Sequence, residues 1–403
     1  MITINAFITL RNSESFRGFE GIDGPTPIGL CDSQINKIPC DYSDPNAKWL
    51  FPAVGHGTYA IIVYWRYMNS LSNVFIDKEE RSRHILKNML YLNEINPALC
   101  RWLRQDGFIN VIEGDYLKYE NNMKFDACVG NLPFNKQNGS ASDEAIWPKF
   151  VEKTFDLVKE NGYVSLIHPG GWRNVDGKFK KVQELLKTKK MEYLEIHDEK
   201  DGLKTFKAET RYDFYVVKNT SPNNHKTKIK GQDGVVEEVD ITNKEFIPNN
   251  NITKLYGMVA EEGEETVEII SDSSYHHQRQ YMSSIQTEEY IFPCIYTVKK
   301  GDVPRIIYSN VNDKGHFGKS KLIWSNGRII SVGSIIDENG DYGLTQYSYG
   351  IVENSENLTM LKECFDSQDF RTLMHSCAVS DMSVNRKIIG LFKKNFWKEF
   401  INE

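Results

Sequence analysis

No stretch of the sequence approaches the roughly 18 uncharged apolar residues that a membrane-spanning helix needs. The first residues, Met-Ile-Thr-Ile-Asn-Ala-Phe, also lack the charged region followed by a long apolar one that is typical of a secretory signal. We therefore expect no membrane partner and a reducing, cytoplasmic location for the protein.

The sequence is also poor in metal-binding and disulfide patterns. Its 7 cysteines form no CxxC or other ligand spacing, and their odd number argues against a disulfide scaffold. Charge is nearly balanced, with 49 basic and 55 acidic residues giving a net charge of -6, so a nucleic-acid partner would require basic residues gathered on one surface. We therefore expect no metal site, and we do not expect nucleic-acid binding over the whole surface of the protein.

What the sequence does contain is typical of a folded protein with two or three domains. Its 403 residues are 40% hydrophobic and 26% charged, which excludes a disordered chain. In the first half, short apolar runs alternate with amphipathic stretches, an order that predicts a parallel sheet with helices on both faces. The predicted strands are 73–76, 125–129, 162–167 and 212–217, and the predicted helices are 79–92, 146–158 and 179–186.

A polar cluster at residues 219–225 (Asn-Thr-Ser-Pro-Asn-Asn-His) ends this alternation. We place a domain boundary there, which predicts domains at 1–218 and 219–403. The second region shows short strands with hairpin signals at 325–328 and 338–341. Its last residues, 383–401, predict one amphipathic helix.

The strongest local signal is residues 129–134 (Val-Gly-Asn-Leu-Pro-Phe). They follow the predicted strand 125–129 directly, so they lie at the carboxyl edge of the sheet, where open α/β folds bind ligands. An isolated Asn-x-Pro-Phe sequence is also typical of a simple turn that ends in proline. Other segments, in order along the chain, favour a binding site.

Three of these segments suit an adenosine-like ligand. Residues 50–58 contain Gly55 and Gly57 and open a helix, so backbone amides can approach a ligand closely. Asp77 ends the next predicted strand, a position where an acidic side chain accepts hydrogen bonds from ribose hydroxyls. Residues 113–116 add Asp115 for an exocyclic amino group and Tyr116 for the face of a purine. The dinucleotide pattern GxGxxG is absent.

Together these residues resemble the S-adenosylmethionine-dependent amino-methyltransferases, specifically the N6-adenine DNA methyltransferases of the γ-type arrangement found in restriction-modification systems. The resemblance covers about 200 residues. The family's Asn-Pro-Pro-Tyr/Phe signature is similar to Asn131-Leu132-Pro133-Phe134, and its Thr-Pro segment is similar to Thr26-Pro27.

The resemblance implies a Rossmann-like, doubly wound methyltransferase sheet followed by a C-terminal mixed α/β target-recognition domain. It implies S-adenosylmethionine as the cofactor and double-stranded DNA as the substrate, and it allows a cognate restriction endonuclease as a partner. The cofactor-binding positions that it implies are Thr26, Gly55, Gly57, Asp77, Asp115, Tyr116 and Asn131. The catalytic positions are Asn131, Leu132, Pro133 and Phe134.

The implied chemistry explains these residue types. An exocyclic adenine amine is a poor nucleophile, and two acceptors aimed at its hydrogens favour a pyramidal nitrogen. The expected acceptors are Asn131 Oδ1 and the Leu132 carbonyl. The base must first leave the DNA stack, and Phe134 and Phe206 are expected on its two faces. A core position is the alternative for Phe206.

Two departures from the family pattern leave alternatives open. Many relatives carry an acidic residue where this chain has Phe51, and proline is commoner where it has Leu132. A catalytically decayed DNA-recognition subunit is therefore one alternative. Methylation of an RNA adenine or a protein glutamine is another, because an Asn-x-Pro-aromatic segment suits any planar amine.

Candidate DNA contacts are basic residues in the C-terminal half. Loops there mix base-reading side chains with aromatics, notably at 275–280, 324–328 and 346–349. The residues that we expect to contact DNA are Arg279, Lys319, Lys321 and Arg328.

Overall fold

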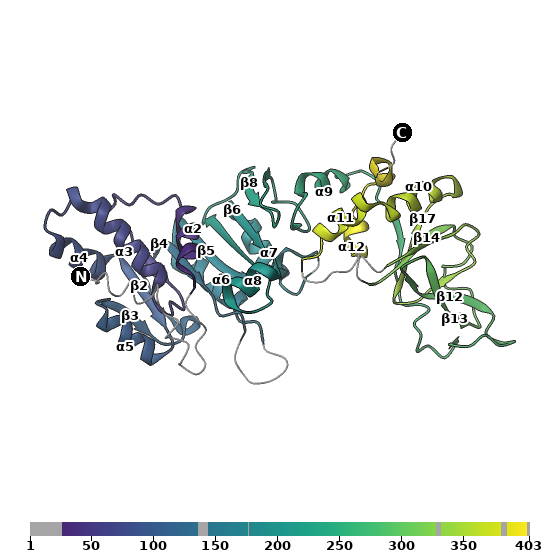
Figure 1. The fold of residues 1–403 in the computed structure, drawn as a ribbon, viewed down its shortest axis with the longest axis horizontal. Coiled ribbons are helices and arrows are strands. Elements are labelled where there is room, and N and C mark those ends of the chain that lie inside the picture. The colour runs from purple at the N-terminus through teal and green to yellow at the C-terminus, as the bar shows by residue number, and fades with distance from the viewer. Residues whose placement is uncertain (1–25, 136–143, 176, 328–331, 380–384, 401–403) are drawn as a thin grey trace. The chain divides into compact units, whose positions relative to one another are not determined.

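The computed structural model describes residues 26–135, 144–175, 177–327, 332–379 and 385–400 (Figure 1). The chain divides into two compact units, Met1–Glu245 and Phe246–Glu403, which we call unit 1 and unit 2. Within the described ranges, no helix combines the length and the apolar character that a bilayer crossing demands.

Unit 1 is built on one mixed sheet. Its strands are β1 (Trp49–Phe51), β2 (Leu90–Glu94), β3 (Asn110–Glu113), β4 (Phe125–Asn131), β5 (Val158–Pro169), β6 (Lys190–His197), β7 (Tyr212–Lys218), β8 (Thr227–Lys230) and β9 (Val236–Val239). They form a 9-stranded sheet in the order β3-β2-β1-β4-β5-β7-β6-β8-β9. The strands from β3 to β5 in this order pair in parallel, and β7 runs antiparallel to both of its neighbours. The order reverses at β1, between β2 and β4, which is the switch point where such sheets bind ligands.

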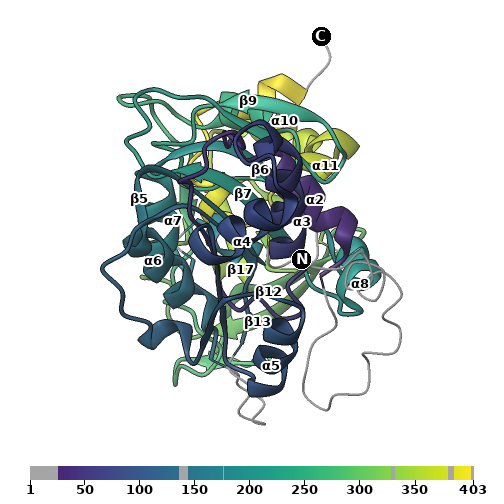
Figure 2. The same ribbon diagram turned by 90° about the vertical axis from the view of Figure 1, so that its left-hand side faces the viewer.

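Helices cover both faces of this sheet. They are α2 (Ile28–Asn36), α3 (Thr58–Ser70), α4 (Lys78–Asn88), α5 (Pro97–Gln105), α6 (Trp147–Leu157), α7 (Lys180–Lys187) and α8 (Glu199–Phe206), with 3-10 turns η2 (Leu71–Asn73), η3 (Tyr116–Lys118) and η4 (Gly170–Arg173). Figure 2 shows α2 and α3 on one side of β6 and β7, with α6 and α7 on the other. Contacts agree, because α2 packs on α3 and β7, whereas α6 and α7 pack on β5 and β6.

The observed elements confirm the strands predicted at 125–129, 162–167 and 212–217 and the helices predicted at 146–158 and 179–186. The helix predicted at 79–92 is confirmed in part, as α4, but the strand predicted at 73–76 is wrong. No strand forms at 73–76; instead η2 is followed by α4, and β2 begins at Leu90, inside the predicted helix. A short buried strand reads as an apolar run, which periodicity alone does not distinguish from a turn of buried helix.

The sheet of unit 1 extends beyond the predicted boundary at residue 218. β8 pairs in parallel with β6, and β9 pairs with β8, so residues 227–239 continue this sheet. The polar cluster at 219–225 is therefore a connection within unit 1, and the division of the chain falls at 245/246.

Unit 2 contains two small sheets. Its elements are α9 (Ile252–Met258), β10 (Glu268–Ile270), β11 (Met282–Ser283), β12 (Phe292–Lys299), β13 (Val303–Ser309), β14 (Lys321–Ser325), β15 (Ser334–Asp337), β16 (Gly343–Leu344), β17 (Ser348–Val352), α10 (Ser355–Asp366), α11 (Gln368–Ser376), α12 (Arg386–Ile389) and η6 (Phe396–Phe400). The 4-stranded sheets have the orders β10-β17-β14-β15 and β11-β13-β12-β16. A shared apolar cluster that includes Ile323 of β14 and Ile295 of β12 joins them.

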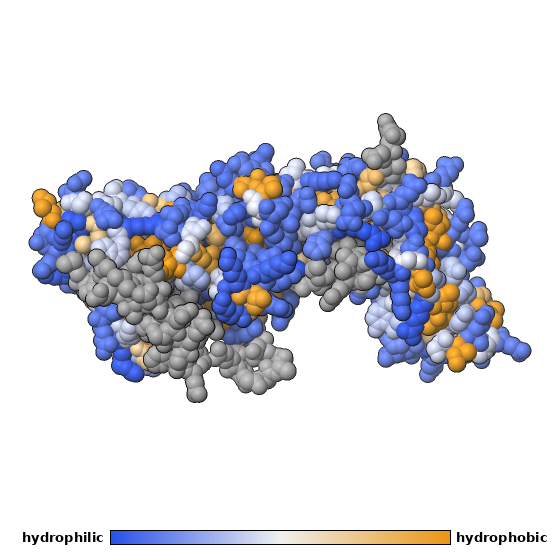
Figure 3. All heavy atoms as spheres, in the orientation of Figure 1, coloured by the Kyte–Doolittle hydropathy of each residue, from blue (hydrophilic) through white to orange (hydrophobic). Residues whose placement is uncertain are grey.

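The C-terminal residues depart from the prediction of one helix over 383–401. The described part contains the short α12 and the separate η6, joined by a segment that includes Asn395 at a φ of 67°. The helix ends at Ile389, and Phe392 and Lys393 form β-bridges before that left-handed residue, although Phe392 and Phe396 are buried as the apolar stripe required. On the face that Figure 3 draws, hydrophobic side chains form separate patches within a largely hydrophilic surface.

Candidate active site

A cleft of about 540 Å³ opens in unit 1 at the carboxyl ends of β1, β2 and β4. Its volume falls in the range of cofactor and small-molecule sites. The residues that line it are Thr26, Ala53, Val54, Gly55, His56, Thr58, Tyr59, Asn93, Glu94, Ile95, Asn96, Leu99, Asp115, Tyr116, Leu117, Asn131, Leu132, Pro133, Glu144, Ile146, Lys149 and Phe150. The predicted positions Thr26, Gly55, Asp115, Tyr116 and Asn131–Pro133 therefore share one cleft.

The loop after β1 forms one wall of this cleft and depends on positive φ angles. Gly55 has a φ of 56°, and Gly57, the N-cap of α3, has a φ of 80°. The positive φ of Gly57 favours glycine, and a Cβ atom there would also meet the Leu103 side chain at 2.8 Å. Gly57 is thus a turn residue beneath the wall and is not a lining residue. The N-terminal turn of α3 faces the cleft through Thr58 and Tyr59.

Glu94 provides the carboxylate at the end of β2. Its Oε2 accepts a hydrogen bond from the Gly55 N–H at 2.8 Å, and its Oε1 accepts one from the Asn96 N–H at 2.9 Å. A carboxylate has about four acceptor positions, so these two bonds leave capacity for a ligand. Sequence reasoning missed this residue. The signal was available, because Asn96-Pro97 is an N-cap followed by proline, which marks the start of α5 and hence the end of the preceding strand.

Asp77 does not belong to this site, which corrects our assignment of the ribose-binding acid. It is the N-cap of α4, where its Oδ1 accepts a hydrogen bond from the Glu80 N–H at 2.7 Å. It is exposed and does not line the cleft. The reason is the chain order, since β2 follows α4 and the acidic residue at its carboxyl end is Glu94.

The segment after β3 reaches the cleft as predicted, but its aromatic ring is engaged elsewhere. Asp115 lines the cleft, and its Oδ1 accepts a hydrogen bond from the Leu117 N–H at 3.0 Å. Tyr116 is 2% exposed, its ring stacks on Phe150 with centroids 5.1 Å apart, and its hydroxyl lies 2.9 Å from Thr154 Oγ1. Tyr116 therefore forms the floor of the cleft and presents little of its ring face.

Asn131 is the last residue of β4, and among the described residues only the nitrogen of its side-chain amide has a hydrogen-bond partner. Its Nδ2 donates a hydrogen bond to Thr26 Oγ1 at 3.2 Å, which fixes the orientation of the amide. Its Oδ1 is buried and has no hydrogen-bond partner among the described residues. A buried acceptor without a partner costs about 1 to 3 kcal/mol, so such an atom points to a ligand that donates to it.

Leu132 and Gly130 hold the main chain around Asn131. The Leu132 N–H donates to the Ile167 carbonyl at 3.2 Å, and the leucine side chain is 3% exposed. A Cβ on Gly130 would lie 3.0 Å from the Pro52 carbonyl oxygen, so glycine lets the ends of β1 and β4 approach each other. Phe51 faces the apolar core beside Trp49, with ring centroids 6.3 Å apart, and does not line the cleft.

Phe134 and Phe206 come together, but not as two parallel faces. Their ring centroids lie 6.4 Å apart at 80°, an edge-to-face contact. Neither residue lines the cleft. A base stacked between them would require the two rings to separate and turn.

The four predicted DNA contacts have different surroundings. The prediction that Lys321 contacts DNA is wrong, because this residue is fully buried on β14, where its Nζ lies 2.5 Å from Asp337 Oδ2. Lys319 is exposed but pairs with Glu268 at 2.9 Å. Arg279 is exposed on the loop that precedes β11. Arg328 lies outside the described residues.

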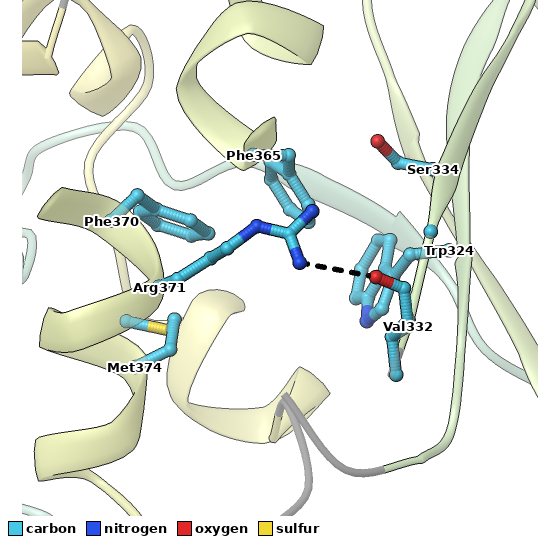
Figure 4. A pocket seen from close by; sticks show the side chains of 8 residues that line it. Trp324, Val332, Ser334, Phe365, Phe370, Arg371 and Met374 are labelled. Carbon is cyan, nitrogen blue, oxygen red and sulfur yellow. Dashed lines mark hydrogen bonds between the residues drawn. The ribbon is translucent and has the colours of Figure 1, made fainter. Parts of the chain in front are cut away.

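A second cavity lies in unit 2 between β14, β15 and α11 and measures about 20 Å³ (Figure 4). Arg371 reaches across it and donates from Nη1 to the Val332 carbonyl at 3.3 Å. Trp324 Nε1 and Ser334 Oγ, both on its wall, have no hydrogen-bond partner in the described part of the chain. About one water molecule fits such a volume, so this cavity is too small for a nucleobase or a cofactor.

Comparisons with known proteins agree with the fold. The family described as Eco57I restriction-modification methylase matches residues 66–206, a segment that runs from α3 to α8 and contains residues 131–134. The resemblance inferred from the sequence is confirmed for this segment. An uncharacterized adenine-specific methylase of Mycoplasma pneumoniae (strain ATCC 29342 / M129 / Subtype 1) is 30% identical over 146 residues, which cover 31% of this chain and 33% of that protein. The chain thus spans about a third of the length of this curated relative.

Among solved structures, a nuclease-deletion mutant of the Type ISP restriction-modification enzyme LlaGI, in complex with a DNA substrate mimic, is 10% identical, with a TM-score of 0.53. The match covers 98% of this chain and 55% of that one. The type IIG restriction endonuclease BpuSI is 11% identical with a TM-score of 0.47, over 97% of this chain and 60% of that one. The predicted Rossmann-like methyltransferase sheet is confirmed.

Proposed function

We propose that this chain is a site-specific DNA methyltransferase that transfers the methyl group of S-adenosylmethionine to N6 of adenine. The observation that carries the proposal is the buried, unpartnered Oδ1 of Asn131 at the end of β4, inside the cleft at the switch point of the sheet. The adenine-specific methylase of Mycoplasma pneumoniae and the match to a restriction-modification methylase family support the same reaction.

The residues of the cleft fit S-adenosylmethionine. Glu94 offers free acceptor positions at the strand end where ribose hydroxyls bind in nucleotide-type folds. The loop at Gly55 and the first turn of α3 bring backbone close to the ligand, and Asp115 suits the exocyclic amine of its adenine. When bound, the cofactor supplies an electrophilic methyl group on a sulfonium.

The chain's own contribution to the reaction is to hold the target amine. Asn131 Oδ1 accepts one N–H of the adenine amine, and the Leu132 carbonyl accepts the other, which favours a pyramidal nitrogen with its lone pair exposed. Because Nδ2 is tied to Thr26 Oγ1, the amide cannot flip without losing that bond. Leucine in place of proline leaves this carbonyl available, so the departure at Leu132 is compatible with catalysis. The chain accelerates methyl transfer by positioning the amine and by electrostatic stabilisation of the charge that develops on its nitrogen.

Double-stranded DNA is the proposed substrate, and the target base must leave the stack to reach Asn131. Phe134 lies beside the catalytic segment and is the proposed stacking partner, with Phe206 moving from its edge-to-face contact. Residues 1–245 are the proposed catalytic domain and 246–403 the proposed target-recognition domain. A cognate restriction endonuclease is a proposed partner, because the solved relative LlaGI is a restriction-modification enzyme.

A methyl-transfer assay with radiolabelled S-adenosylmethionine tests the proposal. Duplex DNA should accept label, and digestion to nucleosides should place it on N6-methyladenine. Asn131→Ala should abolish transfer with little change in cofactor affinity, whereas Asn88→Ala, an exposed asparagine at the end of α4, should behave as wild type. Label in RNA or in protein glutamine, with none in DNA, would favour the other methyltransferase classes. Cofactor binding absent from the wild type would favour a decayed recognition subunit.

A further inference from the structure

Six residues from three segments of unit 2 form one partly exposed surface, which we call the reading surface: His276, His277, Tyr296, Arg305, Gln346 and Tyr347. The ring of His277 packs against His276, Tyr347 and Tyr296, with centroid distances of 4.7, 6.0 and 5.8 Å. The contacts join the loop before β11, the hairpin β12–β13 and the loop after β16. These side chains are far apart in sequence and meet only in the fold.

Gln346 fixes the two loops relative to each other. Its Oε1 accepts a hydrogen bond from the His277 backbone N–H at 3.2 Å, which identifies the oxygen of the amide. Its Nε2 therefore faces His277 Nδ1 and donates to it. A neutral imidazole whose Nδ1 accepts must carry its proton on Nε2.

His276 has the same tautomer, which a different hydrogen bond fixes. Its Nδ1 accepts a hydrogen bond from the Gln278 backbone N–H at 3.2 Å, so its proton also lies on Nε2. Neither Nε2–H has a hydrogen-bond partner in the part of the chain that the structure describes. The two imidazoles are thus donors with fixed tautomers.

Arg305 is the third donor. Its guanidinium lies over the Tyr296 ring at 4.6 Å from the centroid, in a cation–π contact that restricts its rotamers. The register of β12 and β13 shifts between Ile295 and Thr297, and a bulge of this kind re-aims the side chain within it, here Tyr296. Arg305 is exposed, and no carboxylate among the described residues pairs with it. Lys319, by contrast, has Glu268 as its partner.

We propose that the reading surface contacts base edges in the major groove of duplex DNA and that Arg305 selects a guanine. The inference rests on the proposed function, since it requires DNA as the substrate. The bidentate fork of arginine suits guanine, which presents O6 and N7 as acceptors. The histidine donors suit adenine N7 and thymine O4. Cytosine, whose major-groove group is a donor, is disfavoured. Double-stranded RNA is excluded because its major groove does not admit such side chains.

In vitro selection from a library of random-sequence duplexes tests this inference with the full-length protein. The wild type should enrich sequences with an invariant guanine. Arg305→Ala and Arg305→Lys should both lose the preference at that position by about 5- to 150-fold, while the remaining positions stay selected. Lysine keeps the charge but not the planar fork, so its failure would separate base reading from general attraction to phosphates.

Lys394→Ala is the matched control, because it removes an exposed positive charge of unit 2 that already has an acidic partner, Glu265. It should select the same sequence as the wild type. Thermal unfolding of each variant should match the wild type, which keeps a loss of selection from being attributed to misfolding. A second variant, Gln346→Leu, removes both hydrogen bonds to His277 and should weaken selection at a position next to the guanine.

The selection measures binding alone, so its outcome is independent of methyl transfer. Selection of a guanine by a protein that methylates nothing would leave the reading surface standing and remove the proposed reaction. The proposal would be overturned if Arg305→Lys selected the same sequence as the wild type, or if the wild type enriched no sequence. Active methylation with the same sites in the Arg305 variants would overturn it too.

Discussion

The backbone N–H of Gly55 donates a hydrogen bond to Glu94 Oε2 at 2.8 Å, and this bond links the loop after β1 to the end of β2. Glu94 is only 6% exposed, so its carboxylate is held in one orientation towards the cleft. The same bond supports Gly55 at its positive φ of 56°. One carboxylate therefore shapes the loop and, in the proposed function, binds the ribose.

Glu94→Ala should weaken binding of S-adenosylmethionine by about 1 to 3 kcal/mol, roughly 5- to 150-fold in Kd, because both the ligand and the Gly55 N–H lose an acceptor. Isothermal titration calorimetry measures the change. Asp77→Ala is the comparison: it should leave the Kd unchanged and lower stability by about 1 kcal/mol through loss of the α4 N-cap. A Kd that rises in Asp77→Ala and not in Glu94→Ala would reverse this assignment.

Thr26→Val should reduce the turnover number for DNA methylation by about tenfold, equivalent to about 1.4 kcal/mol, because Asn131 Nδ2 loses the acceptor that orients the amide. The KM for cofactor should change much less than kcat. Thr26→Ser retains the hydroxyl and should restore most of the rate. Equal kcat values for the valine and serine variants would show that the hydroxyl does not position Asn131.

Lys321→Ala should lower the free energy of unfolding of unit 2 by about 3 to 5 kcal/mol, since it leaves the buried Asp337 carboxylate without its charge partner. The double change Lys321→Met with Asp337→Leu should recover much of that loss. Lys319→Ala should cost at most about 1 kcal/mol, because its pair with Glu268 is exposed. Urea denaturation of the full-length variants provides the comparison. Similar losses for Lys319→Ala and Lys321→Ala would contradict the burial of Lys321.

His168 should make stability depend on pH. Burial lowers the pKa of His168 from 6.5 to about 4, and its ring stacks on Trp147 with centroids 4.2 Å apart. The unfolded chain therefore binds a proton in a range where the folded chain does not. The stabilisation is fully present above pH 6.5 and is lost as the pH falls from 6.5 towards 4, by at most about 3 kcal/mol.

A variant without the titrating ring isolates this effect. His168→Gln should be less stable at pH 7, and its stability should fall less between pH 6.5 and 4 than that of the wild type. Parallel pH profiles for the wild type and His168→Gln, measured by urea denaturation, would exclude His168 as the source.

Local patterns in the sequence determined much of this protein. The glycines at 55 and 57, the strand that ends at Asn131 and the amphipathic helix after it follow from backbone conformation and from apolar periodicity over a few residues. Those short-range rules placed Gly55, Asp115 and Asn131 near one edge of a parallel sheet, and the resemblance to a methyltransferase family added Thr26. The fold then brought all four to the same cleft.

The tertiary structure placed Glu94 and not Asp77 at the cleft, because β2 lies between β1 and β3 in the sheet; the helix start at Asn96-Pro97 was a local signal for the end of this strand, but a short buried strand has no period of its own. It also decided that Lys321 is buried while Lys319 is exposed. Lys319 precedes β14 and Lys321 begins it, and which of the two lysines is covered depends on packing from distant segments. The contact between His277 and Gln346 joins residues 69 positions apart. Such a contact is fixed by sheet order and loop paths, which no local pattern contains.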